Sequence, residues 1–334
     1  MALRQPQGSP RELRLGTRGS PLALWQANAV AARIAETGGP SSRIVTIKTS
    51  GDRLQEAPLS NAGGKRLFVK EIEDALLGGE IDLAVHSSKD MPALLPAGLA
   101  IAAALPREDP LDAVVLPGRD AARPSTVEEL VLRLGETPSI GTSSVRRIAQ
   151  LLRLFPHARF EPIRGNLDTR LRKLDDGGYG ALVLAAAGLR RLGFASRISF
   201  TLPAAACIPA PGQGIVAVQV READDTTRAI IARIDDPAAH AALSAERAVV
   251  LALGGGCQTP VGALASAVDG RTIELVAIVV ALDGSRAVHQ RMTALREHAE
   301  GLGRAVGAAL LADGAGDILA EAIRHQPPAA VHPS

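Results

Sequence analysis

A cysteine beside three glycines is the residue of this chain best suited to covalent chemistry. Cys257 follows Gly254-Gly255-Gly256 and precedes Gln258-Thr259-Pro260, and the only other cysteine is Cys207. Three glycines in a row indicate a turn or a close approach to the main chain, and an accessible thiolate is a strong nucleophile that can carry a covalent group. The same stretch is also typical of a plain loop that ends in a small, half-buried residue. Taken alone, it favours the plain loop.

Polar side chains gather at five junctions where a predicted strand leads into a predicted helix. The junctions are Arg18-Gly19-Ser20-Pro21, Thr49-Ser50-Gly51-Asp52, Ser87-Ser88-Lys89-Asp90, residues 141–147 with Arg146 and Arg147, and Arg164-Gly165-Asn166 with Arg170 on the next helix. Helix N-termini beside arginines suit anions, and arginine matches carboxylate or phosphate oxygens two at a time. A solvated surface charge is the alternative for each arginine alone. Together the junctions predict a substrate that carries several carboxylates or phosphates.

Asp90 is the one acid within this basic set. Neighbouring cations are expected to lower its pKa and keep it ionised. An ionised carboxylate there can stabilise positive charge on an electron-rich substrate or relay a proton to a leaving amine. The alternative roles are a salt bridge to Lys89 and a helix cap. Gly63-Gly64-Lys65 lacks the spacing of a nucleotide-binding P-loop, so nucleotide hydrolysis is not supported.

Alternating strands and helices in the first two hundred residues predict two open α/β sheets. Predicted strands cover residues 13–17, 43–49, 81–85, 111–116, 139–141, 159–163 and 181–184. The first helix runs to about residue 35, with Ser20 as its N-cap and Pro21 in its first turn. Further helices cover 68–77 and begin near residues 127, 145, 167 and 187. Ligands of such sheets lie outside the carboxyl ends of the strands, where the five junctions fall.

The pattern changes after residue 202. A proline-rich linker leads to a strand at 215–220, which we expect to return to the first sheet, so that two lobes are joined by a hinge at 202–214. Unchanged hydrogen exchange in this linker on substrate loading would contradict the hinge. A helix at 238–253, strands at 261–268, 272–282 and 287–293, and C-terminal helices predict a small α+β domain with an antiparallel sheet.

Composition excludes several classes of function. Hydrophobic residues make up 46% and charged residues 22%, which is typical of ordinary folded domains. Aromatic residues are only 2% and the net charge is +2, so base stacking and general polyanion binding are disfavoured. The start of the chain has no secretory h-region, and its apolar runs are too short to span a bilayer. The histidines and cysteines show no metal-binding spacing, and two free thiols indicate a reducing cytoplasm.

Seven stretches, in this order, resemble the porphobilinogen deaminase family (hydroxymethylbilane synthases). They are residues 16–26 (GTRGSPLALWQ), 63–71 with Gly63-Gly64-Lys65 and Leu67-Phe68-Val69-Lys70-Glu71, 84–92 (AVHSSKDMP), 140–147 (IGTSSVRR), 164–166 (RGN), 211–214 (PGQG) and 255–262 (GGCQTPVG). Arg66 stands where the family pattern leads us to expect glycine. The order and number of the stretches make the resemblance specific.

The resemblance implies a fold and a reaction. The fold would be α/β, with two lobes like those of periplasmic binding proteins: residues 10–107 plus 213–230 form the first, 108–206 the second, and 236–325 a small C-terminal α+β domain that carries the cofactor. The family is a transferase of tetrapyrrole (haem) biosynthesis that uses a dipyrromethane cofactor, held by a thioether, here on Cys257. It condenses four porphobilinogen molecules head to tail, with loss of ammonia, into linear hydroxymethylbilane. Each pyrrole carries an acetate and a propionate, which accounts for the basic junctions.

The resemblance also implies roles for single residues. Asp90 would be the catalytic carboxylate. Cofactor-binding residues would be Cys257, Asp52, Lys89, Ser87, Ser20, Arg146 and Arg147. Substrate carboxylates would be bound by Arg18, Lys65, Arg164, Arg170 and Arg191. No metal, nucleic acid or membrane is expected to take part, Cys207 is expected to be structural, and we expect a cytoplasmic monomer.

Two other classes of function are weighed against this one. A two-lobed anion-binding protein without catalysis would explain the lobes and the basic cleft, but not Cys257 or Asp90, and it would be expected to carry an export signal. A cysteine hydrolase would need a histidine near Cys257 in space. Loss of deaminase activity in Asp90→Asn with the cofactor retained would separate the enzyme from the binding protein.

Overall fold

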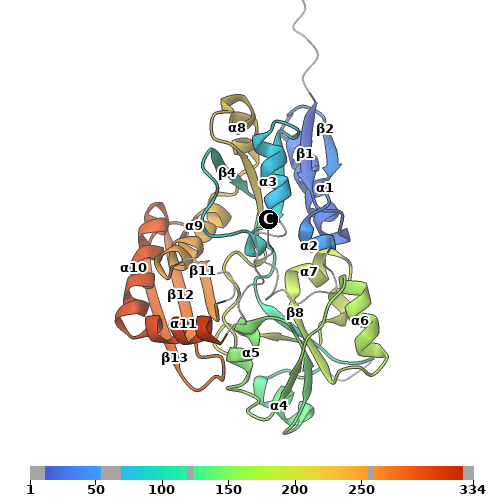
Figure 1. The fold of residues 1–334 in the computed structure, drawn as a ribbon, viewed down its shortest axis with the longest axis vertical. Coiled ribbons are helices and arrows are strands. Elements are labelled where there is room, and N and C mark those ends of the chain that lie inside the picture. Colours follow the sequence, from blue (N-terminus) through green and yellow to red (C-terminus); the bar gives the residue numbers. More distant parts are fainter. Residues whose placement is uncertain (1–11, 54–68, 119–122, 255–258, 326–334) are drawn as a thin grey trace, which may run out of the picture.

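Three β-sheets organise the molecule, and each forms the centre of one body (Figure 1). The computed structural model describes residues 12–53, 69–118, 123–254 and 259–325. In Figure 1 the first lobe lies at the top, the second at the bottom, and the C-terminal domain to the left between them.

The first lobe is a five-stranded mixed sheet with the order β2-β1-β3-β10-β4. Its strands are β1 (Leu13–Thr17), β2 (Ser42–Thr46), β3 (Leu83–Ser87), β4 (Leu99–Ala104) and β10 (Val216–Arg221). β1 is parallel to β2 and β3, whereas β10 is antiparallel to β3 and β4. Its helices are α1 (Pro21–Glu36), α2 (Ser50–Arg53), α3 (Lys70–Leu77), the 3₁₀ turn η3 (Ser88–Asp90), α8 (Asp225–Ile231) and the 3₁₀ turn η5 (Ala232–Ile234).

The second lobe repeats this arrangement, with the order β7-β6-β8-β5-β9. Its strands are β5 (Asp112–Val115), β6 (Ser139–Gly141), β7 (Arg159–Glu161), β8 (Ala181–Ala185) and β9 (Phe200–Leu202). β6 is parallel to β7 and β8, and β5 is antiparallel to β8 and β9. Its helices are α4 (Val127–Leu134), α5 (Val145–Leu151), α6 (Leu167–Asp175), α7 (Ala186–Arg191) and the 3₁₀ turn η4 (Ala195–Arg197).

The chain crosses between the two lobes twice. The first crossing, residues 105–111, leads from β4 to β5, and the second, residues 203–215, leads from β9 back to β10. The crossings are bonded to each other, because the Glu108 amide donates to the Gly214 carbonyl at 3.0 Å, and the Leu105 amide donates to the carbonyl of Val216, where β10 begins, also at 3.0 Å. The strand that follows each crossing, β5 or β10, therefore occupies the fourth position in the order of its sheet.

The C-terminal domain packs helices against one face of the antiparallel sheet β11-β12-β13. Its elements are α9 (Pro237–Ala252), β11 (Val261–Ala267), β12 (Thr272–Val280), β13 (Ala287–Leu295), the 3₁₀ turn η6 (Arg296–His298), α10 (Ala299–Ala312) and α11 (Ala315–Arg324). Leu243 and Val249 of α9 meet Leu275 of β12 and Val306 of α10 in one buried cluster. The opposite face of the sheet packs Val276 and Ile278 against Ala149 of α5 and Ile208 of the second crossing.

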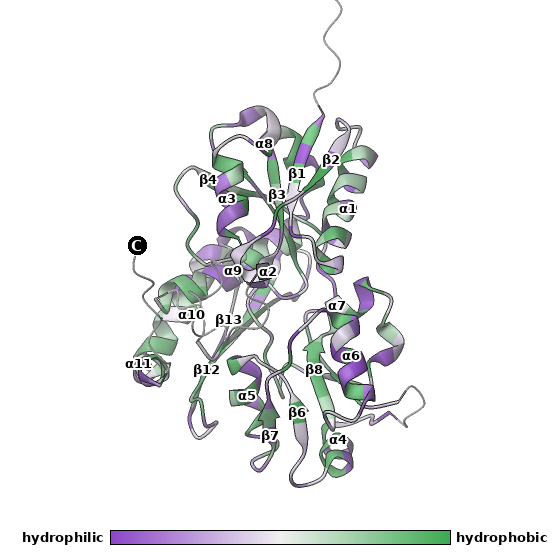
Figure 2. Cartoon of the chain, turned by 45° about the vertical axis from the view of Figure 1, so that its right-hand side comes forward, coloured by the Kyte–Doolittle hydropathy of each residue, from purple (hydrophilic) through white to green (hydrophobic). Residues whose placement is uncertain are grey.

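Hydrophobic strands and amphipathic helices form the cores of both lobes. Figure 2 shows β8 hydrophobic along its length, while α6 carries mostly hydrophilic residues. The Ser20 hydroxyl accepts from the Ala23 amide at 3.3 Å and caps α1, and the Thr126 hydroxyl caps α4 through the Glu129 amide at 3.1 Å. Such caps satisfy amides that the first helical turn leaves without partners.

The predicted fold class, two mixed α/β sheets plus a small α+β domain, is confirmed. The returning strand predicted at 215–220 is β10, which completes the first sheet. Strands β4 and β9 were not predicted, and several predicted bounds differ by two or three residues, as for the helix that begins at Lys70 instead of residue 68. The exact domain boundaries stay a prediction.

Candidate active site

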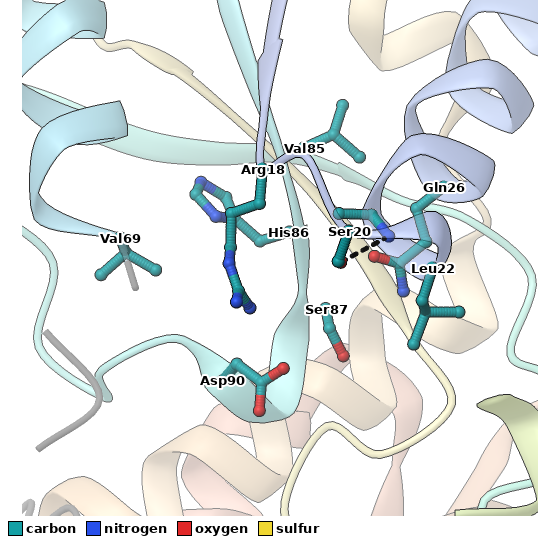
Figure 3. A pocket seen from close by; sticks show the side chains of 10 residues that line it. Arg18, Ser20, Leu22, Gln26, Val69, Val85, His86, Ser87 and Asp90 are labelled. Carbon is teal, nitrogen blue, oxygen red and sulfur yellow. Dashed lines mark hydrogen bonds between the residues drawn. The ribbon is translucent and has the colours of Figure 1, made fainter. Parts of the chain in front are cut away.

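A pocket lies at the carboxyl ends of β1 and β3, where open α/β sheets bind ligands. Figure 3 shows Arg18 from the end of β1 and Ser87 from the end of β3 reaching toward the space beside Asp90. The residues that line the pocket are Arg18, Ser20, Leu22, Ala23, Gln26, Val69, Val85, His86, Ser87 and Asp90. Four of the predicted site residues, Arg18, Ser20, Ser87 and Asp90, therefore share one cavity.

The Asp90 carboxylate ends the 3₁₀ turn η3, directly after β3. It is half-buried, and within the described residues it makes no ion pair or hydrogen bond. The alternatives of a salt bridge to Lys89 and a helix cap therefore receive no support from this geometry. The negative charge of Asp90 nevertheless acts on Lys89 and Arg170. It raises the pKa of each, whereas burial and neighbouring arginines lower it.

Lys89 points from the same turn toward the second crossing. Its ammonium Nζ donates to Gln213 Oε1 at 3.3 Å. Burial lowers the pKa of Lys89 to about 8, the charges of Arg147 and Arg146 lower it too, and those of Asp90 and Asp112 oppose the fall. A substantial neutral fraction therefore exists in mildly alkaline solution.

A glycine permits the second crossing to approach this turn. Gly212 has φ +76°, and a Cβ there would lie 2.3 Å from Ser88 Oγ and 3.2 Å from the Lys89 amide nitrogen. Any other residue would be strained by the backbone conformation and would collide with the turn. Gly212 therefore permits the close contact that brings Gln213 to Lys89.

His86 forms the inner wall of the pocket. Its Nε2 lies 3.1 Å from Gln219 Oε1, and Gln219 Nε2 donates to Glu73 Oε1 at 3.2 Å. All three side chains are buried. Burial lowers the pKa of His86 to about 4, so the ring is neutral at physiological pH and acts there as a hydrogen-bonding group, not as a cation.

Arg146 and Arg147, at the start of α5, turn into the protein and share one carboxylate. Arg146 Nη1 lies 2.8 Å from Asp112 Oδ2, and Arg147 Nη2 lies 2.7 Å from Asp112 Oδ1. The two adjacent arginines therefore hold the same partner. Although burial alone would raise the pKa of Asp112, the two guanidinium charges hold it far below its usual range.

Arg164 and Arg170 lie at the start of α6, across the cleft from Asp90. Arg170 Nε donates to the Gly165 carbonyl at 2.8 Å. Burial lowers the pKa of Arg170, the charges of Arg147 and Arg164 lower it further, and the charge of Asp90 raises it. The charge of Asp90 in the first lobe therefore acts on Arg170 of the second.

Arg191 joins the two lobes. Its Nη2 donates to the Gly214 carbonyl at 2.7 Å, and its Cζ lies 5.3 Å from the ring centre of Trp25 on α1. This distance is typical of a cation–π contact. Arg191 therefore lies against the second crossing and the first lobe at once.

The positions of three predicted site side chains, those of Cys257, Lys65 and Asp52, are not part of the described structure. Cys257 and Lys65 lie outside the described residues, and Asp52 belongs to α2 without a described side chain. The described chain reaches Gly254 after α9 and resumes at Thr259 before β11.

Three polar residues of the site were missed by the sequence analysis. Gln26 is buried in the pocket, and its Nε2 has no hydrogen-bond acceptor within the described residues. Asp112 and Gln213 connect the buried arginines to Lys89. Gln26 could have been found as a polar residue on the buried side of α1, beside Ala27 and Val30. Asp112 could have been found as an acid at the start of an apolar strand.

Other features limit the chemistry. Within residues 12–53, 69–118, 123–254 and 259–325, no group of three histidine, cysteine or acidic side chains could hold a metal ion. The helices of that part of the chain include none with the length and hydropathy to span a membrane.

Cys207 is buried between Arg146 and Asp112, and burial raises the pKa of its thiol to about 12. Such a thiol is neutral and unreactive.

Comparison with known proteins identifies the family. Residues 13–229 match the family model "Porphobilinogen deaminase, dipyromethane cofactor binding domain", and residues 241–312 match "Porphobilinogen deaminase, C-terminal domain". The chain is 44% identical over 319 residues to the porphobilinogen deaminase of Geobacter metallireducens, covering 95% of this chain and 97% of the relative. It is 46% identical over 311 residues to that of Acidithiobacillus ferrooxidans, covering 93% and 98%.

Similarity to solved structures is weaker. An ancestral cationic amino acid solute binding protein covers 67% of this chain and 87% of its own, with 12% identity and a TM-score of 0.41. That similarity supports no argument on function.

The structure is a two-lobed α/β protein with a pocket where strands lead into helices, and the sequence matches give its family. The chain belongs to the porphobilinogen deaminase family. The alternative of a two-lobed anion-binding protein without catalysis is not favoured by these matches.

Proposed function

We propose that this chain is a transferase that condenses four porphobilinogen molecules, head to tail, with release of four ammonia molecules, and that one water then hydrolyses the bond to the primer and releases linear hydroxymethylbilane. Family membership over nearly the whole chain supports the proposal. The observation that carries it is Asp90, an acid without an ion-pair partner within the described residues, set in a pocket that it shares with Arg18 and Ser87. An acid in a basic cleft suits a reaction that passes through a cationic, electron-rich ring.

The pocket fits a pyrrole that carries carboxylate side chains. Leu22, Val69 and Val85 offer apolar contacts for the ring, and Arg18 supplies a cation between Val69 and Val85 (Figure 3). The buried amide of Gln26 has a donor with no acceptor among the described residues, and a ligand oxygen would satisfy it; a buried donor without an acceptor is costly. These residues therefore suit a dipyrromethane or a porphobilinogen ring.

We propose that the dipyrromethane is attached through a thioether to Cys257, where it supplies the pyrrole to which the first porphobilinogen is joined. Ser20, Asp52, Ser87, Lys89, Arg146 and Arg147 are the residues that we propose for binding this cofactor. Arg18, Lys65, Arg164, Arg170 and Arg191 are those that we propose for the carboxylates of the substrate.

Asp90 is the proposed catalytic carboxylate. In each condensation the C–N bond of the aminomethyl group breaks, a C–C bond to a pyrrole α-carbon forms, and the α-hydrogen is lost while the nitrogen leaves as ammonia. Positive charge spreads over the pyrrole nitrogen as the amine departs. A fixed carboxylate beside that nitrogen stabilises the charge and can carry the proton.

We further propose that the protein works as a cytoplasmic monomer without nucleic acid or membrane partners. Light scattering after size-exclusion chromatography measures the oligomeric state. A mass of one chain is expected, and a stable dimer would contradict this part of the proposal.

Replacing Asp90 with asparagine tests the proposed chemistry. We expect Asp90→Asn to lower kcat by about 10²- to 10⁴-fold, the usual contribution of a positioned acid–base group, while the covalent cofactor stays attached. Ammonia release from porphobilinogen measures the rate, and the intact mass reports the cofactor. Asp225→Asn, at an exposed ion pair with Arg228 on α8, is the matched control. Activity of Asp90→Asn equal to that of the control would refute the role of Asp90.

A further inference from the structure

Asp112 is a fully buried acid at the junction of the two crossings. It is the first residue of β5, where the first crossing ends, and its exposure is 0%. Its Oδ1 accepts from Arg147 and from Gln213 Nε2, at 2.7 and 2.9 Å, and its Oδ2 lies 2.8 Å from Arg146. Both oxygens therefore have buried partners.

The Gln213 amide has only one orientation that satisfies its partners. Its Nε2 donates to the Pro110 carbonyl at 2.7 Å and to Asp112, and both of these groups only accept. Its Oε1 therefore faces Lys89, whose ammonium only donates, at 3.3 Å. Without the carboxylate of Asp112, the amide would lose one of the acceptors that fix this orientation.

The contact joins the two lobes beside the candidate catalytic residue. Lys89 follows β3 of the first lobe and precedes Asp90, whereas Asp112 opens β5 of the second lobe. Gln213 lies in the second crossing and is itself fully buried. The path Asp112–Gln213–Lys89 thus reaches from the arginines of one lobe to the ammonium of the other.

We propose that Asp112 is a positioning residue for the reaction, one that fixes Arg146 and Arg147 directly and fixes Lys89 through Gln213. The proposal rests on the proposed function, since the groups it positions are those that would bind the cofactor and substrate. Asp112 itself contacts no ligand in this account. Its removal should therefore weaken ligand binding and change the titration of Lys89, which a purely structural residue would leave alone.

The charges round Lys89 give the sign of that change. Asp90 lies on its own turn, Asp112 on β5, and Arg146 and Arg147 on α5. Asp112 and Asp90 favour the charged ammonium, and the arginines disfavour it. Without the charge of Asp112, only Asp90 offsets the effect of Arg146 and Arg147 on Lys89. The pKa of Lys89 is therefore expected to fall, so that it loses its proton at lower pH.

The first test measures Lys89 without using activity. Trace acetylation of the holoprotein with acetic anhydride at a series of pH values, followed by peptide mass analysis, gives the midpoint at which Lys89 becomes reactive, with the exposed Lys173 as internal reference. We expect the midpoint to lie near pH 8 and to fall by about one unit in Asp112→Asn. Asp109 lies in the first crossing and is paired with Arg190 at 3.1 Å. Asp109→Asn, the control, should leave the Lys89 midpoint unchanged.

The second test separates KM from kcat. At pH 8 we expect Asp112→Asn to raise KM for porphobilinogen about fivefold, because a pKa lowered from about 8 by one unit reduces the charged fraction of Lys89 at that pH by about this factor, and to change kcat less. At pH 6.5 the difference should shrink, because Lys89 is then protonated in both proteins. If Asp112→Asn fails to fold, Gln213→Met keeps the arginine pairs, breaks the contact to Lys89, and should lower the same midpoint.

The outcomes separate the two proposals. If folded Asp112→Asn, or Gln213→Met in its place, keeps the wild-type midpoint and KM, Asp112 is not a positioning residue even though the wild type is active. If the wild type releases no ammonia from porphobilinogen, the proposed function is wrong, and the positioning role falls with it.

Discussion

At the scale of single residues, the site places one acid among cations held at different depths. Asp90 faces the pocket, whereas Arg146 and Arg147 are only 5% and 8% exposed and share Asp112. Buried arginines keep their charge because a carboxylate compensates them, and removing such a partner is more costly than removing an exposed one. The sequence predicted that these arginines gather at the cleft. Asp112 stands at the head of an apolar strand, but its pairing with these arginines could not be predicted, because the partner of a buried charge is determined by tertiary contact.

The titration of Lys89 gives a pH prediction. Its pKa of about 8 lies below the ordinary value of 10.5, so the cation is present below pH 8 and lost above it. We therefore expect kcat/KM for porphobilinogen, which reflects the free enzyme, to decline as pH rises through 8. Lys89→Arg stays charged throughout this range and should remove the decline. A decline of equal size and midpoint in Lys89→Arg would mean that another group causes it.

At the scale of elements, the sequence predicted those helices and strands whose signals lie within a few residues of the element itself. Helix α1 was predicted because Ser20 caps it and Pro21 fits its first turn, and both features lie within a few residues. Strand β4, with the sequence Leu99–Ala104, was missed. It is rich in alanine, which has low strand propensity, and it is a strand because it pairs with β10, more than a hundred residues away. Non-local pairing of this kind leaves no periodic pattern in the segment.

Strand β11 supplies a prediction at this scale. A Cβ on Gly262 would lie 2.7 Å from the Ile208 carbonyl oxygen and 3.0 Å from its Cβ, so the C-terminal domain touches the second crossing there. We expect Gly262→Ala to destabilise the protein by about 1–3 kcal/mol, the usual cost of overpacking, seen as a lower Tm. Gly270→Ala, where a Cβ would meet nothing within 4 Å, should change Tm little. Equal Tm values for the two variants would contradict this packing.

At the scale of the whole molecule, three bodies meet at the two crossings. Glu246 of α9 lies 2.6 Å from Arg107 of the first crossing and accepts from the Gly212 amide of the second at 2.5 Å. The C-terminal domain is thus bonded, through α9, to both segments that join the lobes. A growing product must be accommodated by relative movement of these bodies, and the second crossing stays our predicted hinge.

The covalent cofactor is the central claim, and the intact mass of the denatured, purified protein tests it most directly. We predict an excess over the sequence mass equal to one dipyrromethane, mapped to Cys257 by peptide analysis and absent from Cys257→Ser. Protein purified without the cofactor should gain this adduct, and release ammonia, on incubation with porphobilinogen. A mass that equals the sequence both before and after that incubation would contradict the account.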